Sequence, residues 1–296
     1  ALVLVDGVER DFQNLDPSEI ESFTVLKDAA STAIYGVRAG NGVILVTTKR
    51  GKSNEKIAVS YDGIFTASTN TNFPEFLTGP EYAHYHNMAK TLDGQPIEFD
   101  ERRIGYITNG NDPQGIWGNT DWMKLIFKPF APGTNHKINL NGGTDKIKFY
   151  VGSSYLRQDG IIDKVSFDRY NLRSNLDIKF TDNLTFKVDI AGRLEHKQQP
   201  GVSPGAADPS ASTANGGATM GYKNIIYYAI AAAPVVNPKM KDGTWIGYNN
   251  PLIARDESGF RDHKSRVVQT TMGLNYDANK LLKGLKLSAN FGYDFT

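Results

Sequence analysis

Residues 184–194 read LTFKVDIAGRL, and this stretch decides the fold. Large apolar side chains alternate in it with polar or small ones. The apolar set is Leu184, Phe186, Val188, Ile190 and Leu194. A period of two predicts an extended strand with one apolar and one polar face. Its length suits a strand that crosses a bilayer, whereas strands of soluble proteins average about five or six residues.

The same alternation recurs along the chain. Strong versions lie at residues 170–180 and 285–295. Weaker versions lie at 57–65, 138–141, 147–155 and 268–276. We therefore predict about seven antiparallel strands, with the apolar positions facing lipid and the polar positions facing a lumen. A soluble β-sandwich also alternates, but the strand length and the aromatic residues near the strand ends favour a membrane barrel.

The connections between the predicted strands are of two kinds. Short turns lie at 142–145, 181–183 and 279–284, whereas residues 70–133 and 199–262 form long loops rich in Gly, Pro and Asn. A loop of medium length lies at 158–165, between the first two short turns, so short and longer connections alternate along the chain. Outer-membrane barrels have short periplasmic turns and long extracellular loops, so we predict that these two loops are extracellular.

The overall composition excludes several classes of protein. Among 296 residues, 33 Lys and Arg stand against 32 Asp and Glu, so the charge does not indicate a nucleic-acid partner. Cysteine is absent, which excludes disulfides, thiolate catalysis and Cys-ligated metals. The longest apolar run, 225–236, is too short for a membrane-spanning helix.

Residues 1–52 differ from the rest of the chain. Strand-like runs at 2–5, 22–26 and 42–48 surround a small-residue helix predicted at 29–35. The order of Asp16, Pro17 and Glu19 predicts a helix start with a capping box. We expect a small mixed α/β unit inside the curved sheet that the other residues form.

This first segment resembles the plug signature of SusC/RagA-family TonB-dependent outer-membrane transporters. The runs that carry the resemblance are VDGV at 5–8, LDP at 15–17, VLKDAA at 25–30, AIYG at 33–36 and RAGNGVILVTTKRG at 38–51. The resemblance implies a mainly β fold, in which 1–52 is the C-terminal part of the plug and 53–296 is the N-terminal portion of a transmembrane β-barrel. Such a barrel has roughly 22 strands, so about seven strands cannot close it.

The resemblance also implies a function. We expect TonB-dependent active import of large nutrients, oligosaccharides or peptides, across the outer membrane of a Gram-negative bacterium. The implied partners are a SusD-like surface lipoprotein, the TonB–ExbB–ExbD complex and the lipid bilayer. The alternative is a non-transporting barrel with a structural or adhesive role.

The candidate site residues belong to binding, not catalysis. We predict no enzyme activity and no cofactor, because acidic residues on lumen faces and loops are routine in barrels. We predict no metal site, because His84 and His86 are two residues apart on a predicted helix and cannot share a face. Three tryptophans lie in the long loops, where they either contact substrate or lid or pack within the loops, which is the commoner role. They are Trp117, Trp122 and Trp245. A basic stripe on the lumen face is predicted to contact the plug; it comprises Arg169, Arg173, Lys179, Lys187 and Arg193.

Overall fold

The computed structural model describes residues 1–10, 12, 15–201, 221–247 and 250–296, and these form two sheets. The large sheet has seven strands in the order β11-β10-β9-β8-β7-β6-β5, each antiparallel to its neighbours. They are β5 (Ala58–Ser68), β6 (Ala131–Gly143), β7 (Ile147–Asp159), β8 (Ser166–Thr181), β9 (Leu184–Pro200), β10 (Phe260–Asp277) and β11 (Lys286–Phe295). The sheet is open, with β5 and β11 at its edges, so the prediction of about seven strands of an unclosed barrel is confirmed.

Strands β6 and β10 begin earlier than their alternation indicated. β6 begins at Ala131, seven residues before the apolar pattern begins at Ile138, and β10 begins at Phe260. The early part of β6 includes Gly133 and Asn135, which have no apolar side chain to mark a face. These residues are nevertheless paired with β5 on one side and β7 on the other, so backbone hydrogen bonding sets the strand length.

The N-terminal unit, residues 1–52, contains the second sheet, whose order is β2-β1-β4-β3. Its strands are β1 (Leu2–Val5), β2 (Val8–Glu9), β3 (Ile20–Leu26) and β4 (Val43–Thr48). The parallel pair β1 and β4 is joined through η2 (Pro17–Glu19), β3, α1 (Ala29–Thr32) and η3 (Ala33–Ala39). Two small apolar clusters, around Val43 and around Val46, stabilise the sheet.

The helix expected at 29–35 ends at Gly36 as predicted, because Gly36 has φ 69° and ψ −157°, a conformation that ends regular helix. Only α1 (Ala29–Thr32) is α-helical, however, and the chain continues from Ala33 in 3₁₀ turns. The prediction of a capping box at Asp16 is wrong, because this segment is a single 3₁₀ turn. The Asp16 carboxylate accepts from the Ser18 amide at 2.9 Å, but the Glu19 side chain turns away from the turn and is buried.

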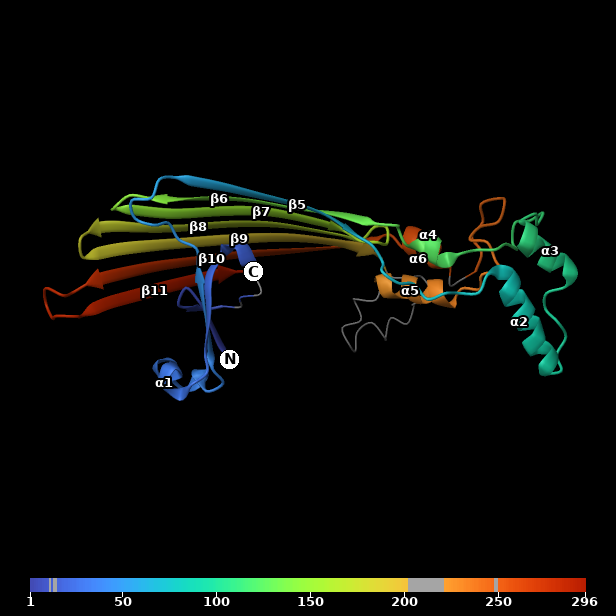
Figure 1. Cartoon of the computed structure of the whole chain (residues 1–296), viewed down its shortest axis with the longest axis horizontal. Coiled ribbons are helices and arrows are strands. Elements are labelled where there is room, and N and C mark those ends of the chain that lie inside the picture. Colours follow the sequence, from blue (N-terminus) through green and yellow to red (C-terminus); the bar gives the residue numbers. More distant parts are fainter. Residues whose placement is uncertain (11, 13–14, 202–220, 248–249) are drawn as a thin grey trace.

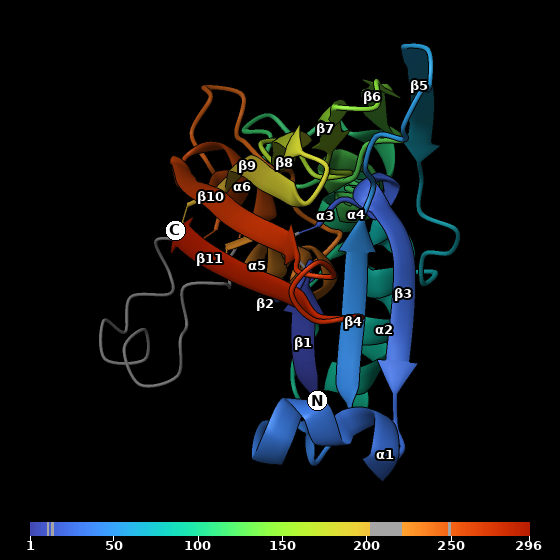
Figure 2. The ribbon, with the colours of Figure 1, turned by 90° about the vertical axis from the view of Figure 1, so that its left-hand side faces the viewer.

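The N-terminal unit lies on the side toward which the large sheet curves. Figure 1 shows its strands running across the direction of the large sheet, and Figure 2, seen along the strands, shows the arc of β5 to β11 around it. The short turns lie at one end of the large sheet, and the helices of the long connections lie at the other. The arrangement is the one expected from the change of period after the first segment.

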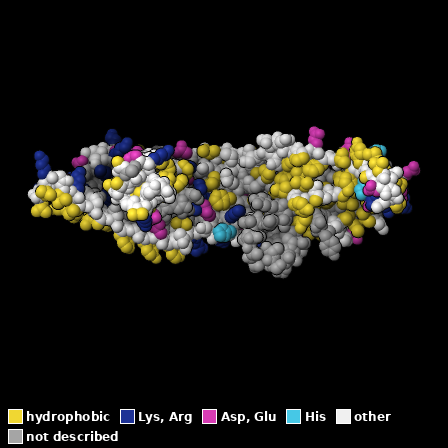
Figure 3. Space-filling view, turned by 90° about the horizontal axis from the view of Figure 1, so that it is seen from below, with side chains coloured by type: hydrophobic (Ala, Val, Ile, Leu, Met, Phe, Trp, Pro, Cys, Tyr) yellow, Lys and Arg dark blue, Asp and Glu magenta, His cyan; other side chains and the backbone are white. Residues whose placement is uncertain are grey.

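The long connections form a helical end to the molecule. Residues 69–130 carry α2 (Gly79–Leu92), α3 (Glu101–Asn109) and α4 (Trp122–Ile126), and the second connection carries α5 (Gly221–Ala231) and α6 (Pro251–Asp256). Residues 202–220 and 248–249 of the second predicted loop lie outside the described residues. Seen from the side of the N-terminal unit, hydrophobic side chains gather over this helical end (Figure 3). None of the described helices is long and apolar enough to span a membrane.

The side-chain alternation of β8 and β9 follows the predicted parity. Arg173, Asp177 and Asp189 all bond to the N-terminal unit, so they lie on the concave face. Leu172 and Ile190, one residue out of phase, are 54% and 45% exposed on the convex face. The convex face is therefore the apolar one, as a lipid-facing wall requires.

Labelling of single cysteines tests this parity directly, since the chain has no cysteine of its own. In the full-length protein in membranes, Leu172→Cys should resist a water-soluble maleimide and Lys187→Cys should react with it. A lipid-soluble quencher should act on a fluorophore at position 172 only. The reverse pattern contradicts the orientation, because a one-residue slip exchanges the two faces.

Candidate functional site

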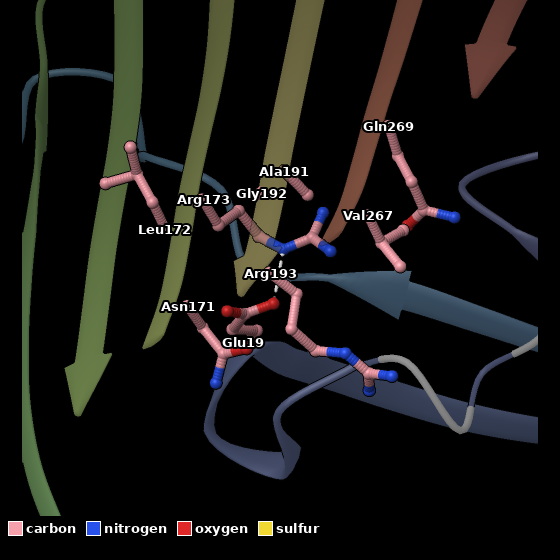
Figure 4. A pocket seen from close by; sticks show the side chains of 9 residues that line it. All are labelled: Glu19, Asn171, Leu172, Arg173, Ala191, Gly192, Arg193, Val267 and Gln269. Carbon is pink, nitrogen blue, oxygen red and sulfur yellow. Dashed lines mark hydrogen bonds and ion pairs between the residues drawn. The ribbon is translucent and has the colours of Figure 1, made fainter. Parts of the chain in front are cut away.

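The first contact between the N-terminal unit and the large sheet is a buried group of charges around η2. Arg173 of β8 donates from Nε to Glu19 Oε2 at 2.6 Å (Figure 4). Lys137 of β6 donates to Asp16 Oδ1 at 2.9 Å, and Arg169 of β8 lies 3.5 Å from Asp16 Oδ2. Two acids of the N-terminal unit thus meet three bases of the large sheet.

Burial makes the charges of this group expensive to separate. The side chains of Glu19 and Arg173 are 8% and 5% exposed, so neither can replace its partner by bulk water. Desolvation raises the pKa of Glu19, and Arg173 only partly offsets it. Burial also disfavours the Asp16 carboxylate, but hydrogen bonds from Ser18 and Lys137 outweigh it and lower the pKa of Asp16.

The second contact lies where the chain passes from β4 toward the large sheet. Arg50 donates to Asp177 Oδ1 of β8 at 2.7 Å and to Asp189 Oδ2 of β9 at 2.5 Å. Beside it, Asn175 donates from Nδ2 to Thr48 Oγ1 at 2.8 Å and to the carbonyl of residue 49 at 2.7 Å. Here the base belongs to the N-terminal unit and the acids belong to the large sheet.

A third contact holds the N-terminal unit to the far strands. Arg10 donates from Nε to Asp294 Oδ2 of β11 at 2.8 Å and from Nη1 to Thr271 Oγ1 of β10 at 2.6 Å. Together the three contacts reach five strands of the large sheet, β6, β8, β9, β10 and β11. The N-terminal unit is therefore held to the concave face by ion pairs and polar hydrogen bonds.

The predicted basic stripe is divided by the structure. Arg169 and Arg173 lie against acids of the N-terminal unit, at Asp16 and Glu19. Arg193 lies 3.5 Å from Glu195 and lines the crevice that also contains Glu19. Lys187 stands opposite Asp177 in the strand register, and Lys179 pairs with Asp182 at 3.0 Å near the short turn.

Sequence reasoning missed the partners of this stripe. The sequence pattern predicts that Asp16 and Glu19 belong to a local helix start, and it assigns no role to Arg10 or Arg50. A signal was available in retrospect: an acidic residue in a short turn that does not cap the turn is free to meet a distant base. Nothing in the linear pattern, however, says which strand faces it.

The three tryptophans lie within packed parts of the loops. Trp122 is 5% exposed, donates to the carbonyl of Ala233 at 3.0 Å and lines a cavity of about 980 Å³ between residues 69–78 and the end of α5. Trp117 packs edge-on against Phe99. Trp245 lies under the Lys239 ammonium, 3.8 Å from the ring centroid.

In the part of the chain that the structure describes, no group of three or more His, Asp or Glu side chains is placed to hold a metal ion. His86 pairs with Glu98 at 2.8 Å, away from His84, which packs against Tyr85.

Comparison with known proteins agrees with this architecture. The family model for the TonB-dependent Receptor Plug Domain matches residues 1–43. The chain is 34% identical over 199 residues to the TonB-dependent receptor SusC of Bacteroides thetaiotaomicron, covering 64% of this chain and 18% of SusC. It is 30% identical over 299 residues to the TonB-dependent receptor P3 of Formosa agariphila, covering 99% of this chain and 26% of P3.

A solved structure shows the same fold. The RagAB peptide importer in its open-open state aligns with a TM-score of 0.70 at 22% identity, over 99% of this chain and 34% of that one. The chain combines a plug-type sheet with a curved antiparallel wall. Together with these matches, this fold defines the chain as a segment of a TonB-dependent receptor. Within that class, the chain belongs to the SusC/RagA family. It spans 18% of the length of SusC and 26% of the length of P3.

Removing one member of the buried pair should loosen the N-terminal unit. In the full-length receptor, Arg173→Met leaves the Glu19 carboxylate buried without its partner, which costs about 3–5 kcal/mol. Amide hydrogen exchange at residues 16–26 should then accelerate by about 100-fold or more. The double variant Glu19→Leu/Arg173→Met removes both charges and should recover most of the protection; equal loss in both variants contradicts the pairing.

The pH dependence of the same variants gives a second test. The raised pKa of Glu19 means that its ionised form disfavours the contact between the N-terminal unit and the large sheet. This free-energy cost therefore develops as the pH rises through the raised pKa. Lowering the pH from about 8 to about 5 should therefore restore part of the protection in Arg173→Met, compared with the wild type at each pH. Asp16 stays ionised over this range because its pKa is lowered. A variant whose deficit grows on acidification contradicts this role of Glu19.

Proposed function

We propose that the chain is the plug and wall segment of an energised importer that carries large nutrients, oligosaccharides or peptides, across the outer membrane of a Gram-negative bacterium. The observation that carries the proposal is the polar docking of the N-terminal unit on the concave face. A unit so placed obstructs the lumen of the barrel that this wall would help to form. Solute can pass only after the ion pairs and hydrogen bonds between the N-terminal unit and the large sheet have separated.

The chemistry of the contacts suits an obstruction that has to move. Ion pairs and hydrogen bonds lose their partners when they separate, but water that enters the gap solvates both sides. A dry apolar interface of the same area has no such compensation. The buried pair of Glu19 and Arg173 remains the costly step, which is why an external source of work is needed.

The proposal includes the partners that such transport requires. A TonB–ExbB–ExbD complex supplies the work, and a SusD-like lipoprotein covers the extracellular side. Family members are outer-membrane β-barrel proteins, and the apolar convex face supports the same placement for this chain. The related SusC and RagAB proteins support import, and RagAB is a peptide importer by name. No catalytic step is proposed.

The loop tryptophans fit this proposal in different ways. Trp117 and Trp245 are only partly buried and are proposed to contact the lid or the substrate. Trp122 is too buried to stack on a ligand with its full face, so it supports the wall of its cavity. Arg169, Arg173, Lys187 and Arg193 are proposed to form the plug-facing stripe of the wall.

A reducible cross-link between the N-terminal unit and the large sheet tests the proposal. Thr48→Cys/Asn175→Cys places thiols where a side-chain hydrogen bond now joins the unit to β8. In the full-length receptor in cells, bridging them with a short methanethiosulfonate cross-linker should abolish uptake and leave cell-surface ligand binding intact. Reduction should restore uptake.

The matched control joins two strands of the wall. Ser60→Cys/Asn139→Cys bridges β5 and β6, where the two residues are opposite each other in register. This bridge should leave uptake unchanged. Uptake that persists with the N-terminal unit fastened contradicts transport through a displaced plug. If neither the wild type nor either cysteine variant takes up solute although the barrel is folded at the cell surface, the result supports a structural barrel instead.

A further inference from the structure

A row of ionisable side chains crosses the convex face of the large sheet near its helical end. The register places Arg157 of β7 opposite Asp168 of β8. Asp168 is opposite His196 of β9, which is opposite Lys264 of β10. Arg266 lies two residues along β10 on the same face. This headgroup row, as we name it, consists of Arg157, Asp168, His196, Lys264 and Arg266.

The headgroup row lies on the opposite face from the N-terminal unit. On β8, β9 and β10 the residues that contact that unit are Arg173, Asp189 and Thr271, all at odd positions. Members of the row on these strands are at even positions, and successive side chains of a strand point to opposite faces. The row therefore faces outward and takes no part in holding the plug.

A continuous apolar stretch of the convex face begins next to this row; on the helical side of the row, the exposed apolar residue of β10 is Phe260. Toward the short turns, exposed apolar residues continue along β10 from Val268 through Leu274 to Tyr276. That stretch spans roughly 27 Å at about 3.4 Å per residue, comparable with the apolar band of about 25 Å in outer-membrane barrels. Tyr155 and Tyr170 stack with ring centroids 4.8 Å apart directly beside the row, as an interfacial aromatic girdle does. These positions place the row at the level of lipid headgroups.

Ion pairs and hydrogen bonds near the headgroup row leave two of its cations without an acidic partner among the described residues. Asp168 accepts from the Tyr155 hydroxyl at 3.0 Å and lies 3.8 Å from Arg157. Arg157 also lies 3.3 Å from Asp159, and His196 lies 3.3 Å from Asp262. Lys264 and Arg266 are exposed, and neither pairs with an acid among the described residues. The acids of this level are thus already engaged by its other members.

We infer that Lys264 and Arg266, beside His196, bind the phosphate of a phosphorylated glycolipid in the outer leaflet. A phosphate oxygen is the acceptor that suits an ammonium and a guanidinium on one face. The acyl chains of the same molecule would lie along the apolar side chains of this face toward the short turns, from Val268 and Leu172 next to the row to Ile190 further along. One amphipathic ligand would therefore contact both the charged and the apolar surface. The inference rests on the membrane orientation in the proposed function, but not on import.

Binding of a defined lipid tests the inference. The full-length receptor is purified in detergent and titrated with lipid A that carries two phosphates, with bound lipid counted by native mass spectrometry. Lys264→Gln/Arg266→Gln should weaken retention by about 30-fold, since each cation near a lipid surface contributes about fivefold. The conservative pair Lys264→Arg/Arg266→Lys should retain binding.

Matched controls isolate the contribution of the lipid phosphate. Lys197→Gln/Lys286→Gln removes two charges from the concave side and should leave lipid binding unchanged. Dephosphorylated lipid A should bind as weakly to the wild type as phosphorylated lipid binds to the Gln pair, and inorganic phosphate at millimolar concentration should compete poorly. Equal binding of both lipids, or equal loss in both Gln pairs, overturns the inference. Heat-dependent gel mobility verifies that each variant is folded. Uptake is measured in a separate assay, so that a failure of transport can be distinguished from a failure of lipid binding.

Discussion

A strict alternation of side chains between two faces is the constraint on which the rest of the structure depends. Because a strand places successive residues on opposite sides, the sequence of β9 necessarily makes one face apolar and the other polar. Seven such strands in one sheet give an apolar convex face and a polar concave face. Whatever lies on the concave face must therefore offer charges and hydrogen-bonding groups rather than a hydrophobic surface.

The N-terminal unit meets that requirement through charges of both signs. Its acids at Asp16 and Glu19 face bases of β6 and β8, and its Arg50 faces acids of β8 and β9. Mixed signs fix one orientation, since a unit rotated on the sheet would bring like charges together. The same polar interface lets the N-terminal unit leave the concave face, because water can hydrate both polar surfaces when they separate. The polar interface therefore accounts both for the orientation of the N-terminal unit and for its ability to be displaced.

Sequence alone predicted the elements better than their contacts. The alternation in β8, β9 and β11 marked those strands, because one face of each is continuously apolar. It marked β6 only from Ile138, since the preceding residues are held by backbone pairing, which leaves no side-chain signal. Arg173 was predicted to contact the plug, but its partner Glu19 was assigned to a capping box. A long-range ion pair depends on the register of distant strands, and local pattern carries no information on that register.

The central claim, that the convex face requires lipid, is tested most directly by the behaviour of this chain in water. Residues 1–296 are refolded in detergent-free buffer and in detergent micelles, and each sample is studied by sedimentation velocity and thermal unfolding. With Leu172, Ile190, Val268 and their neighbours exposed and two sheet edges unpaired, the chain should aggregate without detergent. A monodisperse monomer in buffer with a cooperative melt would contradict the membrane assignment and the transport function built on it.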